Sequence, residues 1–212
     1  MKRSAVVAAL LIVGATFASQ ASASPRTPEP QVDHWPEPLV ATFDMTIGPM
    51  TWGHVDFEDP YVGLQMSGEA LNLDRVTLAG GSVAVAYVGD WLTAGIRLGY
   101  GTTFGGDPPV VGGLGGAVVE GIHVFSWSGE LGLSHRFGDL SIYAVARGVW
   151  SRAIVELDVD ELELRGRRPS IGPKIGLRAH VHRKLFLHAA LFMDALTFPD
   201  HRVTVGLGIG RR

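Results

Sequence analysis

Apolar residues alternate with polar or small residues along most of this chain after residue 38. In the first such run, Leu39, Phe43 and Ile47 fall in one set and Asp44 in the other. A period of two places each apolar set on one face of a β-strand. The same alternation recurs seven times, which predicts eight strands, at 39–48, 79–88, 91–101, 121–137, 140–155, 171–182, 185–194 and 201–210.

The connections between these strands alternate in length. Gly89-Asp90 and Gly138-Asp139 suit two-residue hairpin turns with glycine first, and 182–184 suits a three-residue turn. The other connections are 49–78, 102–120, 156–170 and the shorter 195–200. Short turns at one end and long loops at the other are typical of transmembrane barrels of the bacterial outer membrane. We expect both termini on the short-turn side, so that 49–78, 102–120 and 156–170 lie outside the cell as candidate sites for an external ligand.

The predicted turns also fix which residues lie opposite each other. A slip of one residue would move every side chain to the other face of the sheet. The expected pairs are Tyr87 with Leu92, Phe137 with Leu140, Leu133 with Ala144, Trp127 with Trp150, Ser134 with Tyr143, Glu130 with Arg147, Val181 with Leu185, and Arg178 with His188.

The face opposite the apolar sets carries charged and small residues. A water-soluble barrel would instead fill its interior with large apolar side chains. We therefore expect apolar residues to contact lipid while glycines and paired charges of both signs fill the centre, as an internal salt-bridge network. The charged members of this predicted network are Asp44, Arg97, Glu130, Arg136, Arg147, Lys174, Arg178 and Asp194, and His188 shares their face.

The first 38 residues differ from the rest. Lys2 and Arg3 precede an apolar stretch, and Ala21-Ser22-Ala23 offers a small-residue cleavage site, so residues 1–23 are predicted to be a secretory signal peptide. Residues 24–38 hold five prolines and are predicted to form an extended periplasmic linker, with a disordered tail as the alternative. The barrel then occupies 39–212.

The composition of the chain excludes several kinds of site and gives no indication of others. The chain has no cysteine, which rules out disulfides and thiolate metal sites, and a formal charge of −3 gives no indication of a nucleic-acid partner. No cofactor is predicted. His180, His182 and His188 lie close in sequence, but we interpret them as ordinary polar residues rather than metal ligands.

This architecture resembles the family of outer membrane protein A transmembrane domains and outer membrane protein X. The resemblance covers roughly 39–210. It implies an all-β, eight-stranded antiparallel up-and-down transmembrane β-barrel, a monomer placed in outer-membrane lipid by the outer-membrane assembly machinery. Ten strands result if 51–66 pairs as an extra hairpin. One departure is the end of the chain, Gly208-Ile209-Gly210-Arg211-Arg212, where members of the family usually have an aromatic residue.

Three functions follow as hypotheses. A structural or surface-interaction role comes first. A narrow channel comes second, with Glu130 and Arg147 as a gate whose partners exchange with Arg97 or Arg178. A lipid-modifying enzyme that resembles lipid A deacylases comes third, because His123, Ser126, Ser128 and Glu130 share one strand. His123 and Ser126 should face opposite sides, so no catalytic residue is predicted.

The stretch from Val155 to Leu164 alternates acidic with apolar residues. It is interpreted as a hairpin that extends above the membrane with its acidic face towards water.

Overall fold

The computed structural model describes residues 39–89, 91–103, 110–111, 116–159, 162–182, 184–197 and 200–210. The predicted signal peptide, 1–23, and linker, 24–38, lie outside the described residues, as do Arg211 and Arg212. The described residues contain no helix long and apolar enough to cross a membrane.

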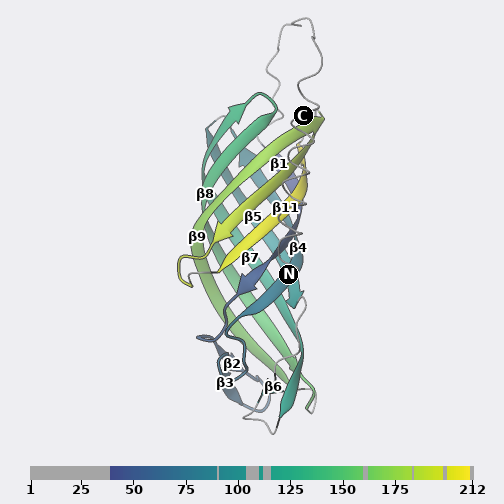
Figure 1. The fold of residues 1–212 in the computed structure, drawn as a ribbon, viewed down its shortest axis with the longest axis vertical. Coiled ribbons are helices and arrows are strands. Elements are labelled where there is room, and N and C mark those ends of the chain that lie inside the picture. Colours follow the sequence, from purple (N-terminus) through teal and green to yellow (C-terminus); the bar gives the residue numbers. More distant parts are fainter. Residues whose placement is uncertain are drawn as a thin grey trace, which may run out of the picture. The chain divides into compact units, whose positions relative to one another are not determined.

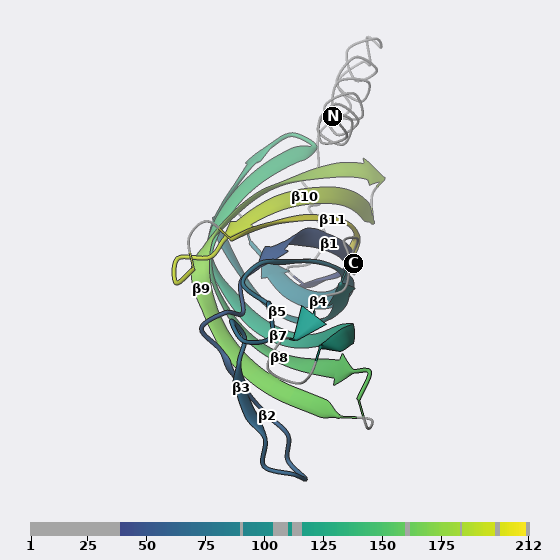
Figure 2. The same ribbon diagram turned by 60° about the horizontal axis from the view of Figure 1, so that its bottom comes forward.

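Eight antiparallel strands close into a barrel (Figures 1 and 2). Each barrel strand pairs with the next one along the chain, and the last pairs with the first. The predicted up-and-down barrel is therefore confirmed. Its strands are β1 (Leu39–Met50), β4 (Val76–Val88), β5 (Leu92–Thr103), β7 (Ala117–Phe137), β8 (Leu140–Leu157), β9 (Glu163–His182), β10 (Leu185–Met193) and β11 (His201–Gly210).

Three short strands lie outside this ring: β2 (Asp56–Glu58), β3 (Gln65–Ser67) and β6 (Val110–Val111). β2 pairs with β3 and, through Phe57 and Glu58, with the free edge of β9. The extra hairpin considered for 51–66 thus exists, but it packs beside the ring and the barrel keeps eight strands rather than ten.

The central hairpin has the predicted register. Phe137 pairs with Leu140, and Glu130 lies opposite Arg147. Gly138 has a φ of 60°, as the first central residue of a type II′ turn requires. The other predicted pairs of this hairpin are confirmed as well: Leu133 with Ala144, Trp127 with Trp150, and Ser134 with Tyr143.

The predicted turn at Gly89-Asp90 is wrong in length. Tyr87 pairs with Ala94 rather than with Leu92. The Gly89 amide donates to the Leu92 carbonyl at 2.8 Å, which makes a wider connection than a two-residue turn. Because the register moves by two residues, the faces stay as predicted.

The turn between β9 and β10 differs at one pair. His188 lies opposite Arg178 as expected, but Leu185 pairs with His182 instead of Val181. A bulge between Leu185 and Phe186 accommodates the extra residue.

Several strands are longer than predicted at the long-loop end. β8 continues to Leu157 and β9 starts at Glu163, so most of the expected loop 156–170 is strand. The acidic–apolar hairpin predicted around 155–164 forms, with Glu156 opposite Glu163. As Figure 1 shows, β7, β8 and β9 extend beyond β10 and β11. The loops expected at 49–78 and 102–120 shorten likewise to the segments between β1 and β4 and between β5 and β7.

The outward face of the barrel carries an apolar band between two levels of aromatic residues. Trp91 and Phe137 lie at the short-turn end, and Trp127 and Trp150 lie towards the other end, all four exposed. From Leu140 to Trp150 the strand rises about 33 Å, which a tilt near 40° turns into about 25 Å, the height expected of a membrane-facing band. We call this region the membrane band. Exposed apolar residues fill it on all sides, including Phe43, Val85, Ile96, Leu98, Leu131, Leu133, Ile142, Ile171, Ile175, Leu177, Val205 and Leu207.

Candidate functional site

Glu130 is the centre of a charge network inside the membrane band. Both of its carboxylate oxygens accept hydrogen bonds from Lys174 Nζ at 2.9 Å. The Nε atoms of Arg97 and Arg147 each lie 3.4 Å from Oε1 of Glu130. Inward alternation on β5, β7, β8 and β9 brings these four side chains together. The Glu130 carboxylate thus contacts three buried cations, and interior charges require such partners.

Asp44 is the second carboxylate of this network. It pairs with Arg97 and with His188 Nε2, and Thr42 Oγ1 donates to it at 3.2 Å. Gly206 lies opposite Asp44 on β11. A Cβ at Gly206 would collide with Asp44, so only glycine leaves room for this cluster. We call Asp44, Arg97, Glu130, Arg147, Lys174 and His188 the interior network.

Arg178 adjoins the interior network through Tyr143. Its guanidinium carbon lies 4.1 Å from the centre of the Tyr143 ring, and Nη2 donates to Thr93 Oγ1 at 3.3 Å. Lys174 Nζ lies 5.6 Å from the same ring. Tyr143 therefore separates two cations by offering each a π-face. Sequence reasoning placed Tyr143 only as a cross-strand neighbour of Ser134 and missed this role.

The interior network leaves little space. The cavity beside Arg97, Glu130, Lys174 and Arg178 measures about 20 Å³. A single water needs roughly that much, so this cavity has room for about one water.

Two residues predicted for the network lie elsewhere. Arg136 is at the short-turn end, where its Nε donates to the Gly138 carbonyl at 2.8 Å. Asp194 lies at the opposite end, 2.8 Å from Arg168 Nη2. Both alternate inward as predicted, but their positions along the barrel axis are too far from its middle to join Glu130.

A second cluster fastens the long-loop end. Arg168 Nη2 contacts Asp194 and also Asp200, at 2.9 Å, and donates to Thr197. Asp200 in turn accepts from the Thr51 amide at 2.7 Å and from its hydroxyl at 2.8 Å. This cluster ties β9 to the segments that follow β1 and β10. Arg168 was missed because 156–170 was expected to be a loop, although Leu164 and Arg168 already share an inward face.

Apolar side chains fill the barrel mouth above this level. Trp52, Phe57, Leu71 and Leu73, which we call the cap, are fully buried. The rings of Trp52 and Phe57 lie 6.0 Å apart. The cap packs against inward-facing apolar residues of the strands in one cluster, namely Met50, Val76, Leu78, Ala117, Val119, Ile122, Val124, Ala153, Val155, Leu157 and Leu164, together with Val55.

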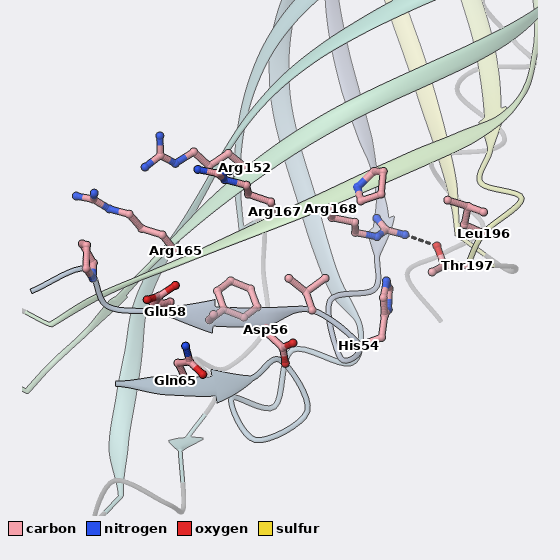
Figure 3. A pocket seen from close by; sticks show the side chains of 14 residues that line it. His54, Asp56, Glu58, Gln65, Arg152, Arg165, Arg167, Arg168, Leu196 and Thr197 are labelled. Atoms are coloured by element: carbon pink, nitrogen blue, oxygen red, sulfur yellow. Dashed lines mark hydrogen bonds between the residues drawn. The ribbon is translucent and has the colours of Figure 1, made fainter. Parts of the chain in front are cut away.

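A groove of about 1140 Å³ lies along the edge of β9, between β2 and the segment that follows β10 (Figure 3). Arg152, Arg165 and Arg167 lie together at one side of it, while His54, Leu196 and Thr197 lie at the other. Cationic side chains dominate the strand side, whereas Asp56 and Glu58 come from the hairpin.

The residues considered for lipid enzymology are not brought together. His123 points outward, where Tyr100 Oη lies 2.6 Å from Nδ1 and Glu156 lies 3.5 Å from Nε2. Ser126 belongs to the inward set of the same strand, as expected from its spacing. Ser128 and Glu130 are also inward, so His123 activates neither serine in this arrangement.

The three histidines considered as metal ligands separate likewise. His188 belongs to the interior network, whereas His180 packs against the ring of Phe186 and His182 is exposed near the turn. The described residues contain no group of three or more His, Asp or Glu side chains that could hold a metal ion.

Comparison with known proteins gives likenesses of structure alone. No protein-family model matches the sequence, and no curated protein matches it either. Among solved structures, Neisserial surface protein A (NspA) superposes with a TM-score of 0.55 and 10% identity, over 83% of this chain and 99% of that one. Ail, the attachment invasion locus protein of Yersinia pestis, superposes with a TM-score of 0.46 and 12% identity, over 82% of this chain and 97% of that one. The N-terminal β-barrel domain of Pseudomonas aeruginosa OprF superposes with a TM-score of 0.40 and 13% identity, over 82% of this chain and 98% of that one. The likeness to NspA confirms that this chain has the fold of the small eight-stranded barrels.

Proposed function

We propose that this protein is a closed, non-conducting barrel of the outer membrane whose long-loop end faces the outside and serves as an interaction surface. One observation carries the proposal: the apolar face of the strands changes side along their length. In the membrane band it points outward, as lipid requires, and beyond Trp150 it points inward, as water requires. The long-loop end is thus built as a water-exposed folded unit on a membrane anchor.

The closed interior favours this role over the narrow channel. The interior network fills the middle of the barrel, and the cap fills its mouth with side chains such as Trp52 and Phe57. A conducting pore needs a wider polar interior, as larger barrels have. A gate at Glu130 would have to break contacts to Lys174, Arg97 and Arg147 at once.

Two measurements on purified mature protein test the proposal. Folded protein should migrate differently from heated protein on a gel. In planar bilayers the same preparation should give no discrete conductance steps, and Glu130→Ala should give none either. Steps in the wild type that Glu130→Ala alters would establish the channel instead, and unchanged mobility on heating would contradict the membrane barrel.

Orientation needs a separate test, because it decides which end meets a partner. We expect external protease on intact cells to cleave an inserted recognition site after Val159, in the connection between β8 and β9, and to leave a site inserted after Gly138 uncut. The reverse pattern would contradict the proposed surface role.

A further inference from the structure

The outer face of β8 and β9 carries an unusual concentration of arginine. Arg152 and Arg167 are direct cross-strand partners, and Arg165 follows on the same face of β9. We call these three residues the arginine patch. Opposite residues in antiparallel strands have Cβ atoms about 5 Å apart, so two like charges there are unfavourable unless an anion lies between them.

The residues that the structure describes do not supply that anion to two of the three. Arg165 contacts Glu163 at 3.3 Å and lies over the ring of Tyr61. Arg152 and Arg167 are exposed and make no hydrogen bond or ion pair with any other described residue.

The height of the arginine patch identifies its surroundings. Arg152 lies two residues beyond Trp150 on the same outward face, about 7 Å along the strand. Trp150 pairs with Trp127 and Pro169, which form the upper edge of the membrane band. Aromatic side chains of this kind lie at the level of lipid headgroups. The guanidinium groups directly above them therefore meet the headgroups rather than the acyl chains or open water.

We propose that the arginine patch binds the phosphate groups of lipid headgroups in the leaflet around the long-loop end. Guanidinium groups bind phosphate through two parallel hydrogen bonds, and a phosphate between Arg152 and Arg167 removes their mutual repulsion. The adjoining groove along β2, about 1140 Å³ in volume, gives such a headgroup room beside the barrel wall. This inference rests on the membrane placement proposed above.

The test compares lipids that differ only in phosphate. Wild-type protein and R152Q/R167Q are placed in nanodiscs of digalactosyldiacylglycerol, a lipid without phosphate, that contain lipid A with two phosphates or the same lipid with its phosphates removed. Lipid retained by the protein is counted by native mass spectrometry, and the thermal unfolding midpoint is recorded. R75Q is the matched control, because Arg75 is an exposed arginine that precedes β4.

We expect the wild type and R75Q to retain the phosphorylated lipid, with R152Q/R167Q weaker by about tenfold. Phosphorylated lipid should raise the unfolding midpoints of the wild type and R75Q but not that of R152Q/R167Q. In nanodiscs of digalactosyldiacylglycerol alone, R152Q/R167Q should unfold at the same temperature as the wild type or higher, because the repulsion between Arg152 and Arg167 has been removed.

Equal retention by the wild type and R152Q/R167Q would overturn the proposal. So would displacement of the lipid by millimolar inorganic phosphate, which would identify a site for free phosphate. A gel-mobility shift on heating, recorded for every sample, separates this failure from failure of the membrane placement.

Discussion

The same strands behave differently in the membrane band and beyond it. On β8, Ile142 and Trp150 point outward within the band, whereas Arg152 and Glu156 point outward above it. The inward face changes too, from a mixture of Arg147 with Val145 and Val149 within the band to the apolar residues of the mouth above it. The backbone period stays at two throughout, so the surrounding solvent decides which face is apolar. A single barrel thus combines a region whose apolar residues face outward with a region whose apolar residues form an interior core.

The variant with the largest expected effect on stability removes the carboxylate at the centre of the interior network. Glu130→Ala leaves Lys174, Arg97 and Arg147 buried without their shared partner, which should lower the free energy of unfolding by about 3–5 kcal/mol. Urea titration in lipid vesicles measures it. Glu120→Ala, on an exposed acid of the same strand, should change stability by less than about 0.5 kcal/mol. Similar losses in both variants would remove the distinction between the two regions.

The cap should respond to a cavity as a soluble core does. Trp52→Ala should cost about 3 kcal/mol, towards the lower end for such truncations because Trp52 Nε1 has no hydrogen-bond partner among the described residues. We expect the effect to be local, with faster hydrogen exchange at Leu73 and Leu71. The mobility shift of the barrel on heating should persist. Its loss would mean that the cap and the membrane band unfold as one unit.

The lipid-facing surface should reject charge only inside the band. Leu131→Arg, midway between the two aromatic levels, should destabilise the protein by about 2–3 kcal/mol in vesicles. Val159→Arg, an equally apolar exposed position above the band, should have almost no effect. A comparable cost at both positions in unfolding titrations would contradict the assigned band.

The smallest expected effect is the local loss of stability around Asp59 at low pH. Val62 and Tyr61 amides donate to Asp59 at 2.8 and 2.7 Å, and these hydrogen bonds hold the pKa of Asp59 below its ordinary value of 3.8 despite burial. A lowered pKa in the folded state stabilises the turn between β2 and β3 above pH 3.8, and this support is lost as the pH falls through the lower folded value. The protection factor of the Val62 amide, which corrects its exchange rate for the slower intrinsic exchange in acid, should therefore fall at low pH, and Asp59→Asn should abolish that dependence.

Periodicity predicted the barrel because its strands repeat one pattern, in which outward apolar residues alternate with inward polar or small ones. It predicted the faces of Glu130, Arg147, Lys174 and Arg97 correctly even where the turn at Gly89 was misjudged, since a shift of two residues preserves every face. Depth along the axis was harder to predict. Arg136 and Asp194 share the inward face of the network, but alternation alone says nothing about how strand tilt and stagger set their height.

The region beyond the band was predicted less well for a physical reason. Its strands follow the rule of soluble proteins, so the criterion of apolar residues outside assigned 156–170 to a loop and missed Arg168. Trp52 and Phe57 lie in a connection with no repeating pattern, and only tertiary packing buries them. The alternating acids near Glu156 were the one signal in the sequence that the barrel continued.

The boundary between the two regions can be measured directly along β8. The chain has no native cysteine, so single cysteines at Ile142, Ala146, Trp150, Arg152 and Glu156 can each carry a spin label. In vesicles, labels up to Trp150 should collide with oxygen dissolved in lipid, and labels from Arg152 onward should collide with a water-soluble nickel complex. A uniform accessibility along the whole strand, to either reagent, would contradict a barrel that turns inside out at this level.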